Sequence, residues 1–144
     1  MTITQALCNS WKQEILEGEH NFQVAGNTFN LALYLDATAT LNKSTTAYTS
    51  TGEVADGGNY LARGQALTNI APTLDGDVAV LDFVDETWAS STITADGALI
   101  FNESHAGDAS VMALNFGGSK ASSNGDFTVQ FPAAVAATAI IRIT

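Results

Sequence analysis

Residues Met1–Phe22, with the sequence MTITQALCNSWKQEILEGEHNF, carry the helical pattern that sets the expected fold. Thr2-Ile-Thr-Gln5 has the form of a capping box, in which a Thr hydroxyl and a Gln side chain satisfy unpaired backbone donors. Apolar residues then recur at every fourth position and form one stripe, which consists of Ile3, Leu7, Trp11 and Ile15. Gly18 is a typical residue at a helix end. The pattern predicts an amphipathic N-terminal helix over about residues 3–17.

The rest of the chain has the pattern of short strands. Asp75-Gly-Asp77 is a hairpin turn signal, and Asp96-Gly97 indicates a bulge inside a strand. The segments with strand character are Thr28–Leu35, Leu61–Leu74, Val78–Val84, Thr92–Phe101, Val111–Phe116, Phe127–Phe131 and Thr138–Thr144. Their near-regular spacing predicts a mainly β fold, an antiparallel β-sandwich of about seven or eight strands with one N-terminal helix. We expect a single domain over residues 1–144.

Two segments are rich in Thr, Ser, Asn and Gly and are expected to be surface loops. They are Asp36–Gly58, with a short edge strand around Ala47–Thr49, and Gly117–Gly125. Several strands, such as Val78–Val84, are apolar on both faces, whereas a sandwich strand needs only one buried face. The second face therefore needs a cover, and the N-terminal helix and a neighbouring subunit are the two candidates.

Charge and composition exclude several classes of function. The 144 residues carry a net charge of −10, and the five basic residues are scattered, so we expect neither direct nucleic-acid binding nor adsorption to an anionic membrane. Apolar runs are too short to span a bilayer. Cys8 is the only cysteine and is expected to be a packed thiol. The N-terminus has no secretory signal pattern, so the protein is expected to stay in the cytoplasm or to leave within a particle.

No residue set predicts an enzyme. His20 follows the helix, where an imidazolium interacts well with the helix dipole. His105 lies near Glu103 and Asp108, but no second histidine, cysteine or nucleophile accompanies this group in the sequence. The Gly-x-Ser-x-Gly pattern of hydrolases and the phosphate-binding loop pattern are both absent.

An acidic cluster around the expected hairpin is the one candidate for a metal site. It contains Asp75, Asp77, Asp82, Asp85 and Glu86. Oxygen-rich loops can bind calcium, but the EF-hand spacing is absent, and ordinary turn chemistry explains Asp-Gly-Asp equally well. We therefore expect no metal and no cofactor.

Three glutamates, Glu14, Glu17 and Glu19, gather near the C-terminal end of the expected helix. Negative charge there opposes the helix dipole, and Lys12 offsets only part of it. Locally unfavourable residues often mark interaction surfaces, so this acidic end is a candidate contact to a basic partner. A merely solvated acidic end is the alternative.

Segments along the whole chain resemble a family of small virion structural proteins of tailed bacteriophages, especially phages of aquatic bacteria. These segments are ITQALCNSWKQEILEG, TFNLALYL, TTAYTSTGEV, LDFVDETWASSTITADGALIFN, SSNGDFTVQFP and AIIRI. The resemblance implies a non-enzymatic role in the particle, and it transfers no catalytic or binding residues.

Within that resemblance, a capsid decoration protein that binds the major capsid lattice in many copies is the preferred expectation. A tail-associated or host-attachment protein is the alternative, and a calcium- or carbohydrate-binding β-module is a third, weaker one. The expected partners are phage structural proteins and further copies of the chain, and the expected location is the virion.

Overall fold

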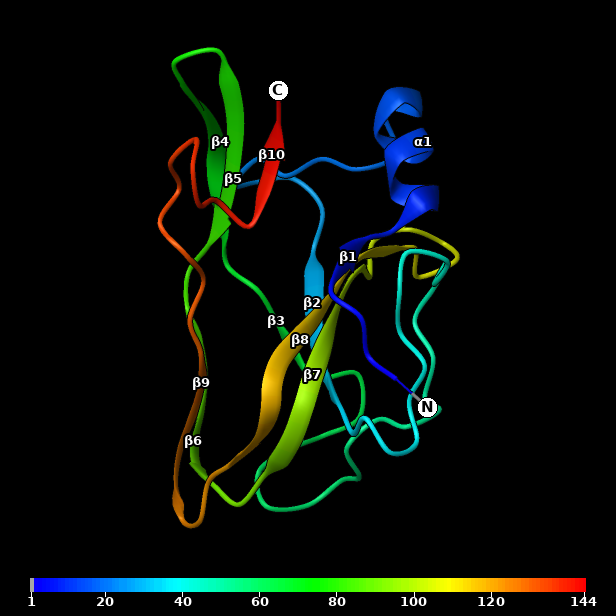
Figure 1. Ribbon diagram of the computed structural model, residues 1–144, viewed down its shortest axis with the longest axis vertical. Helices are drawn as coiled ribbons and strands as arrows, with labels where there is room; N and C mark the ends of the chain where they lie inside the picture. Colours follow the sequence, from blue (N-terminus) through cyan, green and yellow to red (C-terminus); the bar gives the residue numbers. More distant parts are fainter. Residues whose placement is uncertain (1) are drawn as a thin grey trace.

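The structure is a computed structural model that describes residues 2–144. It is mainly β, with 45% of the residues in strands and 6% in helix, as the strand pattern predicts (Figure 1). The elements in chain order are β1 (Ala6–Leu7), α1 (Asn9–Glu17), β2 (Phe29–Tyr34), β3 (Gln65–Ala66), β4 (Asn69–Asp75), β5 (Val78–Phe83), β6 (Glu86–Ser91), β7 (Thr94–Asn102), β8 (Ser110–Ala121), β9 (Gly125–Val129) and β10 (Ile141–Ile143).

The strands form two layers. One layer is a five-stranded antiparallel sheet in the order β1-β8-β7-β2-β3. The other layer contains two smaller antiparallel sheets, β10-β5-β4 and β6-β9, which follow each other along one side of the molecule (Figure 1). The arrangement is an antiparallel β-sandwich.

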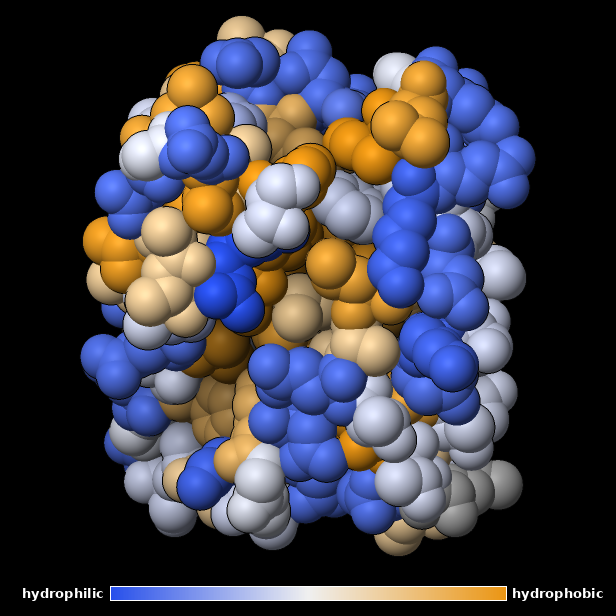
Figure 2. Space-filling view, turned by 45° about the horizontal axis from the view of Figure 1, so that its top comes forward, coloured by the Kyte–Doolittle hydropathy of each residue, from blue (hydrophilic) through white to orange (hydrophobic). Residues whose placement is uncertain are grey.

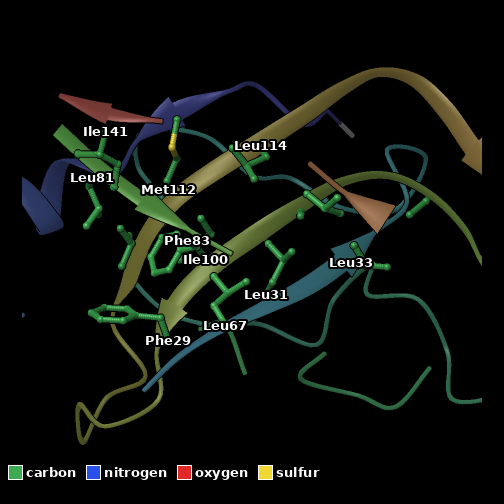
Figure 3. Close-up of a cluster of buried hydrophobic side chains, with 14 of the residues drawn as sticks. Phe29, Leu31, Leu33, Leu67, Leu81, Phe83, Ile100, Met112, Leu114 and Ile141 are labelled. Carbon is green, nitrogen blue, oxygen red and sulfur yellow. The ribbon is translucent and has the colours of Figure 1, made fainter. Parts of the chain in front are cut away.

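The main core lies between the two layers. Strand β2 contributes Phe29, Leu31 and Leu33, all fully buried, and side chains from β5 and β10 meet them from the opposite layer (Figure 3). At about 25 cal/mol for each Å² of apolar surface removed from water, this interface supplies a large part of the stability. Further buried members of this core are Trp88, Ile93, Ile100, Met112, Leu114, Phe127 and Ile141.

The opposite face of the five-stranded sheet is buried as well. A sandwich strand needs only one buried face, but all six residues of β2 are buried. Its outward residues Ala32 and Tyr34 pack in a second cluster with Leu41 and Phe101. The cover comes from the segment Asp36–Arg63, which we call the clasp.

The clasp corrects two expectations. Asp36–Gly58 is not simply a surface loop, because Ala39 and Leu41 within it are fully buried. The second face is covered by the chain's own clasp and by Ile3, not by the helix or a neighbouring subunit. Ala47–Thr49 forms no strand but only a single bridge, between Ala47 and Ala109.

The expected long N-terminal helix is wrong over its first half, and Met1 lies outside the described residues. The helix begins only at Asn9, and the residues before it are extended, with Ala6–Leu7 pairing antiparallel with β8. Gln5 forms no capping box, because its Oε1 accepts the Asn115 N–H at 3.3 Å. Pairing with β8 satisfies the backbone and lets Ile3 bury in the second cluster, which outweighs a weak helix propensity.

The expected helix end is confirmed. Gly18 has φ = 78°, and its N–H donates to the Ile15 carbonyl at 3.4 Å, while the Glu19 N–H donates to the Glu14 carbonyl at 3.0 Å. This pair of hydrogen bonds is a Schellman motif, which suits a glycine because the left-handed conformation disfavours a Cβ.

The strand expectations hold in outline. The Asp75-Gly-Asp77 turn joins β4 and β5. The register of β7 shifts at Asp96-Gly97, where a bulge was expected, but the extra residues lie on β8, because Ala95 pairs with Lys120 and Gly97 with Asn115. Two boundaries differ. Leu61–Leu74 contains both β3 and β4, and Gly117–Ala121 continues β8, so it is not part of a long loop.

Candidate functional site

An open groove lies between the two layers at the borders of β8 and β9. It has a volume of about 490 Å³ and an apolar floor to which Leu114, Phe127 and Val129 contribute. A second hollow of about 330 Å³ shares Gln5, Pro132 and Ile140 with it and continues between β1 and β10. Figure 2 shows a hollow with an apolar floor and hydrophilic residues around it on this side of the molecule.

The groove exists because β8 and β9 are neighbours in sequence but belong to different layers. The connection at Ser122–Asn124 crosses from one layer to the other. Ser122 secures this crossing, since its N–H donates to the Ile93 carbonyl at 2.8 Å and its Oγ lies 2.8 Å from the Ser91 Oγ. The two strands therefore diverge from a common turn instead of pairing, and the space between them stays open.

The edge of β9 borders the groove. Consecutive residues from Asp126 to Pro132 line it, although neighbouring residues of a strand point to opposite faces, so the strand presents an edge and not a face. Within residues 2–144, β9 pairs with β6 alone, which leaves its outer edge without a ladder partner.

The direction of the backbone donors in β9 follows from one hydrogen bond. The Phe131 N–H donates to Asp85 Oδ1 at 2.8 Å, on the side of β6. Because alternate residues of a strand direct their N–H groups to the same side, Val129 also faces β6, while Thr128 and Gln130 direct theirs to the outer edge.

The groove is also the place where cationic side chains gather. Lys120 and Arg142 line it, and they are two of the five basic residues in the chain. Neither forms an ion pair within the described residues. Asp126 is the only one of the fifteen acidic residues in the lining, and its Oδ1 accepts the Ser90 N–H at 3.2 Å. The groove therefore differs in charge from the acidic remainder of the surface.

The sequence-predicted contact residues Glu14, Glu17 and Glu19 lie away from the groove lining, and each has a partner in the structure. Glu14 Oε2 lies 2.7 Å from His20 Nε2, Glu17 accepts the Gln13 amide at 2.7 Å, and Glu19 Oε2 lies 3.5 Å from His105 Nε2. These contacts give the three carboxylates a structural role, and the proposed contact to a basic partner stays a prediction.

The two histidines, distant in sequence, lie together, with ring centroids 6.2 Å apart. His20 Nδ1 lies 3.1 Å from Asn102 Nδ2, and His105 Nδ1 accepts the Gly107 N–H at 3.1 Å. The His20 Nε2–H then donates to the Glu14 carboxylate, and the protonated His105 Nε2 faces Glu19 at 3.5 Å. No free acceptor nitrogen remains on either ring for general-base chemistry.

The two acidic residues near His105 in the sequence, Glu103 and Asp108, have a structural partner as well. Asp108 forms a two-pronged contact with Arg63, with its oxygens 2.9 and 3.2 Å from the guanidinium, and Glu103 lies 3.3 Å from the same side chain. The Arg63 guanidinium also stacks over the Tyr48 ring at 4.7 Å. Arg63 thus joins the clasp to the end of β7.

The carboxylates of the acidic hairpin cluster accept hydrogen bonds from several different backbone N–H groups. Asp75 accepts the Ala136 N–H at 2.6 Å, and Asp82 Oδ1 accepts the Phe83 N–H at 2.8 Å. Burial raises the pKa of Asp82 and of Glu86 above their ordinary values. In the part of the chain that the structure describes, no three His, Cys, Asp or Glu side chains are grouped so that they could hold a metal ion.

Glu53 is the polar centre of the clasp, and the sequence did not single it out. Its carboxylate accepts the Tyr48 hydroxyl at 2.5 Å, the Tyr60 hydroxyl at 2.8 Å and the Arg63 N–H at 2.6 Å. The Tyr60 hydroxyl in turn accepts the Leu33 N–H at 2.9 Å, which connects the network to β2. Burial and the nearby Glu53 raise the pKa of Tyr48 to about 12.

Sequence patterns did not identify the groove residues, because the groove depends on two strands that diverge in space. Lys120 and Arg142 lie 22 residues apart in the sequence and share no motif. Cys8 is buried, as expected, and burial raises its pKa. No helix among residues 2–144 has both the length and the apolar character to cross a membrane.

Comparisons with protein-family models, with curated proteins and with solved structures found no match to the chain.

Proposed function

We propose that the protein is a non-catalytic structural component of a bacteriophage particle, and that it binds the major capsid lattice as a decoration protein. The resemblance of its segments to small virion structural proteins supports the assignment to a particle. The groove supports binding as the mode of action, because it combines an apolar floor, an unpaired strand edge and cations without acidic partners.

The groove is the observation that carries the proposal. The hollow that continues it lies between β1 and β10, and β10 lies at the same end of the molecule as α1 (Figure 1). On that end Leu16 of α1 is 88% exposed and Ile143 of β10 is 52% exposed.

The strands that the sequence predicts to be apolar on both faces do not provide the surface for this contact. In β8, the residues from Val111 to Leu114 are buried within the single chain, and so are Val80, Leu81 and Phe83 of β5. The proposed partner surface is therefore the groove and the end of the molecule beside it.

A tail-associated or host-attachment role is the alternative. It needs projecting polar loops as contact tips, and Asp36–Gly58 and Gly117–Gly125 were the candidates. Asp36–Gly58 is part of the clasp and is fastened to the sheet, and the first residues of Gly117–Gly125 belong to β8. These observations favour the decoration role over the attachment role.

The test is to add purified protein to phage particles assembled without it and to image the mixture by electron cryo-microscopy. Regular density over the head shell, at hundreds of copies per particle, is the result we expect. Density confined to the tail, at a few to a few dozen copies, would transfer the role to tail structure or attachment. Binding to neither part, with a protein that is monomeric in solution, would contradict both roles and the expected homo-oligomer.

A further inference from the structure

We infer that the groove is a β-augmentation site, which binds an extended peptide segment of a partner protein as a new strand on the outer edge of β9. The segment carries apolar residues at alternate positions and at least one carboxylate. The inference rests on the proposed function in one respect, namely that the partner is another protein of the particle.

The edge of β9 supplies the backbone partners. The Thr128 and Gln130 N–H groups point to the outer edge, where no strand pairs with them within residues 2–144. An unpaired edge of this kind is a template for main-chain hydrogen bonds with an added strand. Strand β9 is five residues long, which corresponds to about 17 Å of extended chain and an added strand of similar length.

The floor of the groove supplies apolar contacts for every second side chain of such a strand. Phe116, Phe131 and Ile140 line it and are only partly buried, so they still present apolar surface to the opening. An extended segment places alternate side chains on one face, and a strand bound at β9 would direct that face to this floor.

The cations supply the preference for a carboxylate. The Lys120 side chain lines the groove and has no hydrogen-bond or ion-pair partner in the described part of the chain. Arg142 lines the adjoining hollow without an acidic partner, but its guanidinium donates to the Ala136 and Ala137 carbonyls, so the preference for a carboxylate rests mainly on Lys120. By contrast, the Arg63 guanidinium contacts two carboxylates. A carboxylate on the bound segment would complement the groove, whereas a basic segment would be attracted to the rest of this acidic surface instead.

The shape of the groove favours a peptide over a compact ligand. The two connected hollows, of about 490 and 330 Å³, run from the borders of β8 and β9 to the gap between β1 and β10. Gln5, Asn115 and Thr128 are among the polar residues of the lining, although the Asn115 and Thr128 side chains and the Gln5 Oε1 already hydrogen-bond within the protein. A long, open groove with polar groups spaced along it suits a backbone with repeated donors and acceptors.

The first test uses a fluorescein-labelled eight-residue peptide in which valine alternates with threonine or aspartate. Its control has the same sequence with N-methyl groups at alternate residues, which removes the donors of one edge. We expect chemical-shift changes at Thr128, Gln130 and Phe131 on addition of the peptide, and binding of the methylated peptide about tenfold weaker. No shift change at about 1 mM peptide, or equal binding of both peptides, would contradict the inference.

The second test compares charge reversals in the full protein. Lys120→Glu should weaken binding of the same peptide about fivefold, while Lys43→Glu, an exposed residue outside the groove lining, should leave it unchanged. Thr128→Pro removes one outer N–H and should abolish binding, and a proline at an edge position with an outward N–H is compatible with the fold. If Thr128→Pro fails to fold, Gln130→Pro replaces it. Equal losses of peptide affinity for Lys120→Glu and Lys43→Glu would show that net charge alone causes the effect. That result would contradict peptide binding at the groove.

Particle binding separates this inference from the proposed function. Wild-type protein that decorates particles, together with Lys120→Glu and Thr128→Pro variants that decorate them equally well, would contradict the peptide site and leave the decoration role intact. Peptide binding at the groove without binding to any particle would support the site and contradict the role. Self-association through the groove, seen as a dimer that the peptide dissociates, would assign the bound strand to a second copy and contradict a separate partner.

Discussion

The second face of the five-stranded sheet and the groove beside β9 differ in how their apolar side chains are covered. Both expose apolar side chains that one sandwich interface cannot bury. On the second face, the clasp supplies Ala39 and Leu41, and both are fully buried. At the groove, no segment among residues 2–144 pairs with the edge of β9.

The difference lies in the polar groups as much as in the apolar ones. The clasp is fastened by Glu53, which receives three donors, and by the Tyr34 hydroxyl, which donates to the Thr49 carbonyl at 2.7 Å. At the groove, backbone donors of β9 and the side chain of Lys120 have no such protein partners. The polar groups of the clasp hydrogen-bond within the protein, whereas these backbone donors of β9 and the Lys120 side chain have no protein partner among the described residues and are available to a ligand.

Removing an apolar residue from the clasp should give the largest effect. Leu41→Ala should lower the free energy of unfolding by about 2–5 kcal/mol, because it leaves a cavity over the second face. Leu61→Ala, also in the clasp but 70% exposed, should change it by less than about 0.5 kcal/mol. Urea unfolding followed by tryptophan fluorescence measures both. Equal, small effects would mean that the clasp is not part of the core.

The polar centre of the clasp should give an intermediate effect. Glu53→Gln places an amide donor against groups that themselves donate, so at least one buried donor loses its acceptor. We expect a loss of about 1–3 kcal/mol in the free energy of unfolding. Glu17→Gln, on the exposed helix surface, is the matched control and should be neutral. A neutral Glu53→Gln would show that the clasp is held by apolar packing alone.

Alkaline pH should open the clasp. All three tyrosines of the chain lie at the clasp, and burial raises the pKa of each, that of Tyr48 to about 12. Because the folded pKa lies above the unfolded value of about 10, this stabilisation is complete below pH 10 and is lost as the pH rises through 12.

Absorbance at 295 nm, which follows tyrosinate, checks this dependence together with circular dichroism. Ionisation and unfolding should occur in the same pH range. Full ionisation of the tyrosines near pH 10 in a protein that keeps its fold would contradict the burial of their hydroxyl groups.

The exposed apolar side chain of β10 should give the smallest effect on stability. Ile143→Ser should change the free energy of unfolding by less than about 0.5 kcal/mol, because the side chain is 52% exposed, and should still weaken binding to particles. Ile141→Ser, two residues away on the same face of β10 but buried, should destabilise the protein strongly. Similar unfolding curves for the two variants would remove the distinction between core and open surface.

Local patterns predicted those parts of the fold that depend on neighbouring residues. The alternation in Phe127–Phe131, the hairpin turn at Asp75-Gly-Asp77 and the helix end at Gly18 appear in the structure because each depends on a few consecutive residues. In each case a turn, a period or a backbone conformation is encoded within one short window.

The N-terminal segment shows why the same reasoning fails elsewhere. Ile3 and Leu7 fit a helical stripe equally well when the stripe is judged from spacing alone. The edge of β8 offers backbone partners to Ala6–Leu7, and the second cluster offers a buried site to Ile3, so the segment is extended. Spacing within the segment contains no information on either partner, which lies about 40 or more residues away.

By itself, the sequence determined that this acidic chain folds as a mainly β protein with one N-terminal helix ending at Gly18, because strand alternation, turn residues and charge are local or additive properties. Only the tertiary structure decided that Asp36–Arg63 closes the second face, that Glu53 collects three donors, and that β8 and β9 diverge to leave a groove with Lys120 at its border. These features depend on contacts between residues far apart in the chain, and their free energy appears only when both sides are in place.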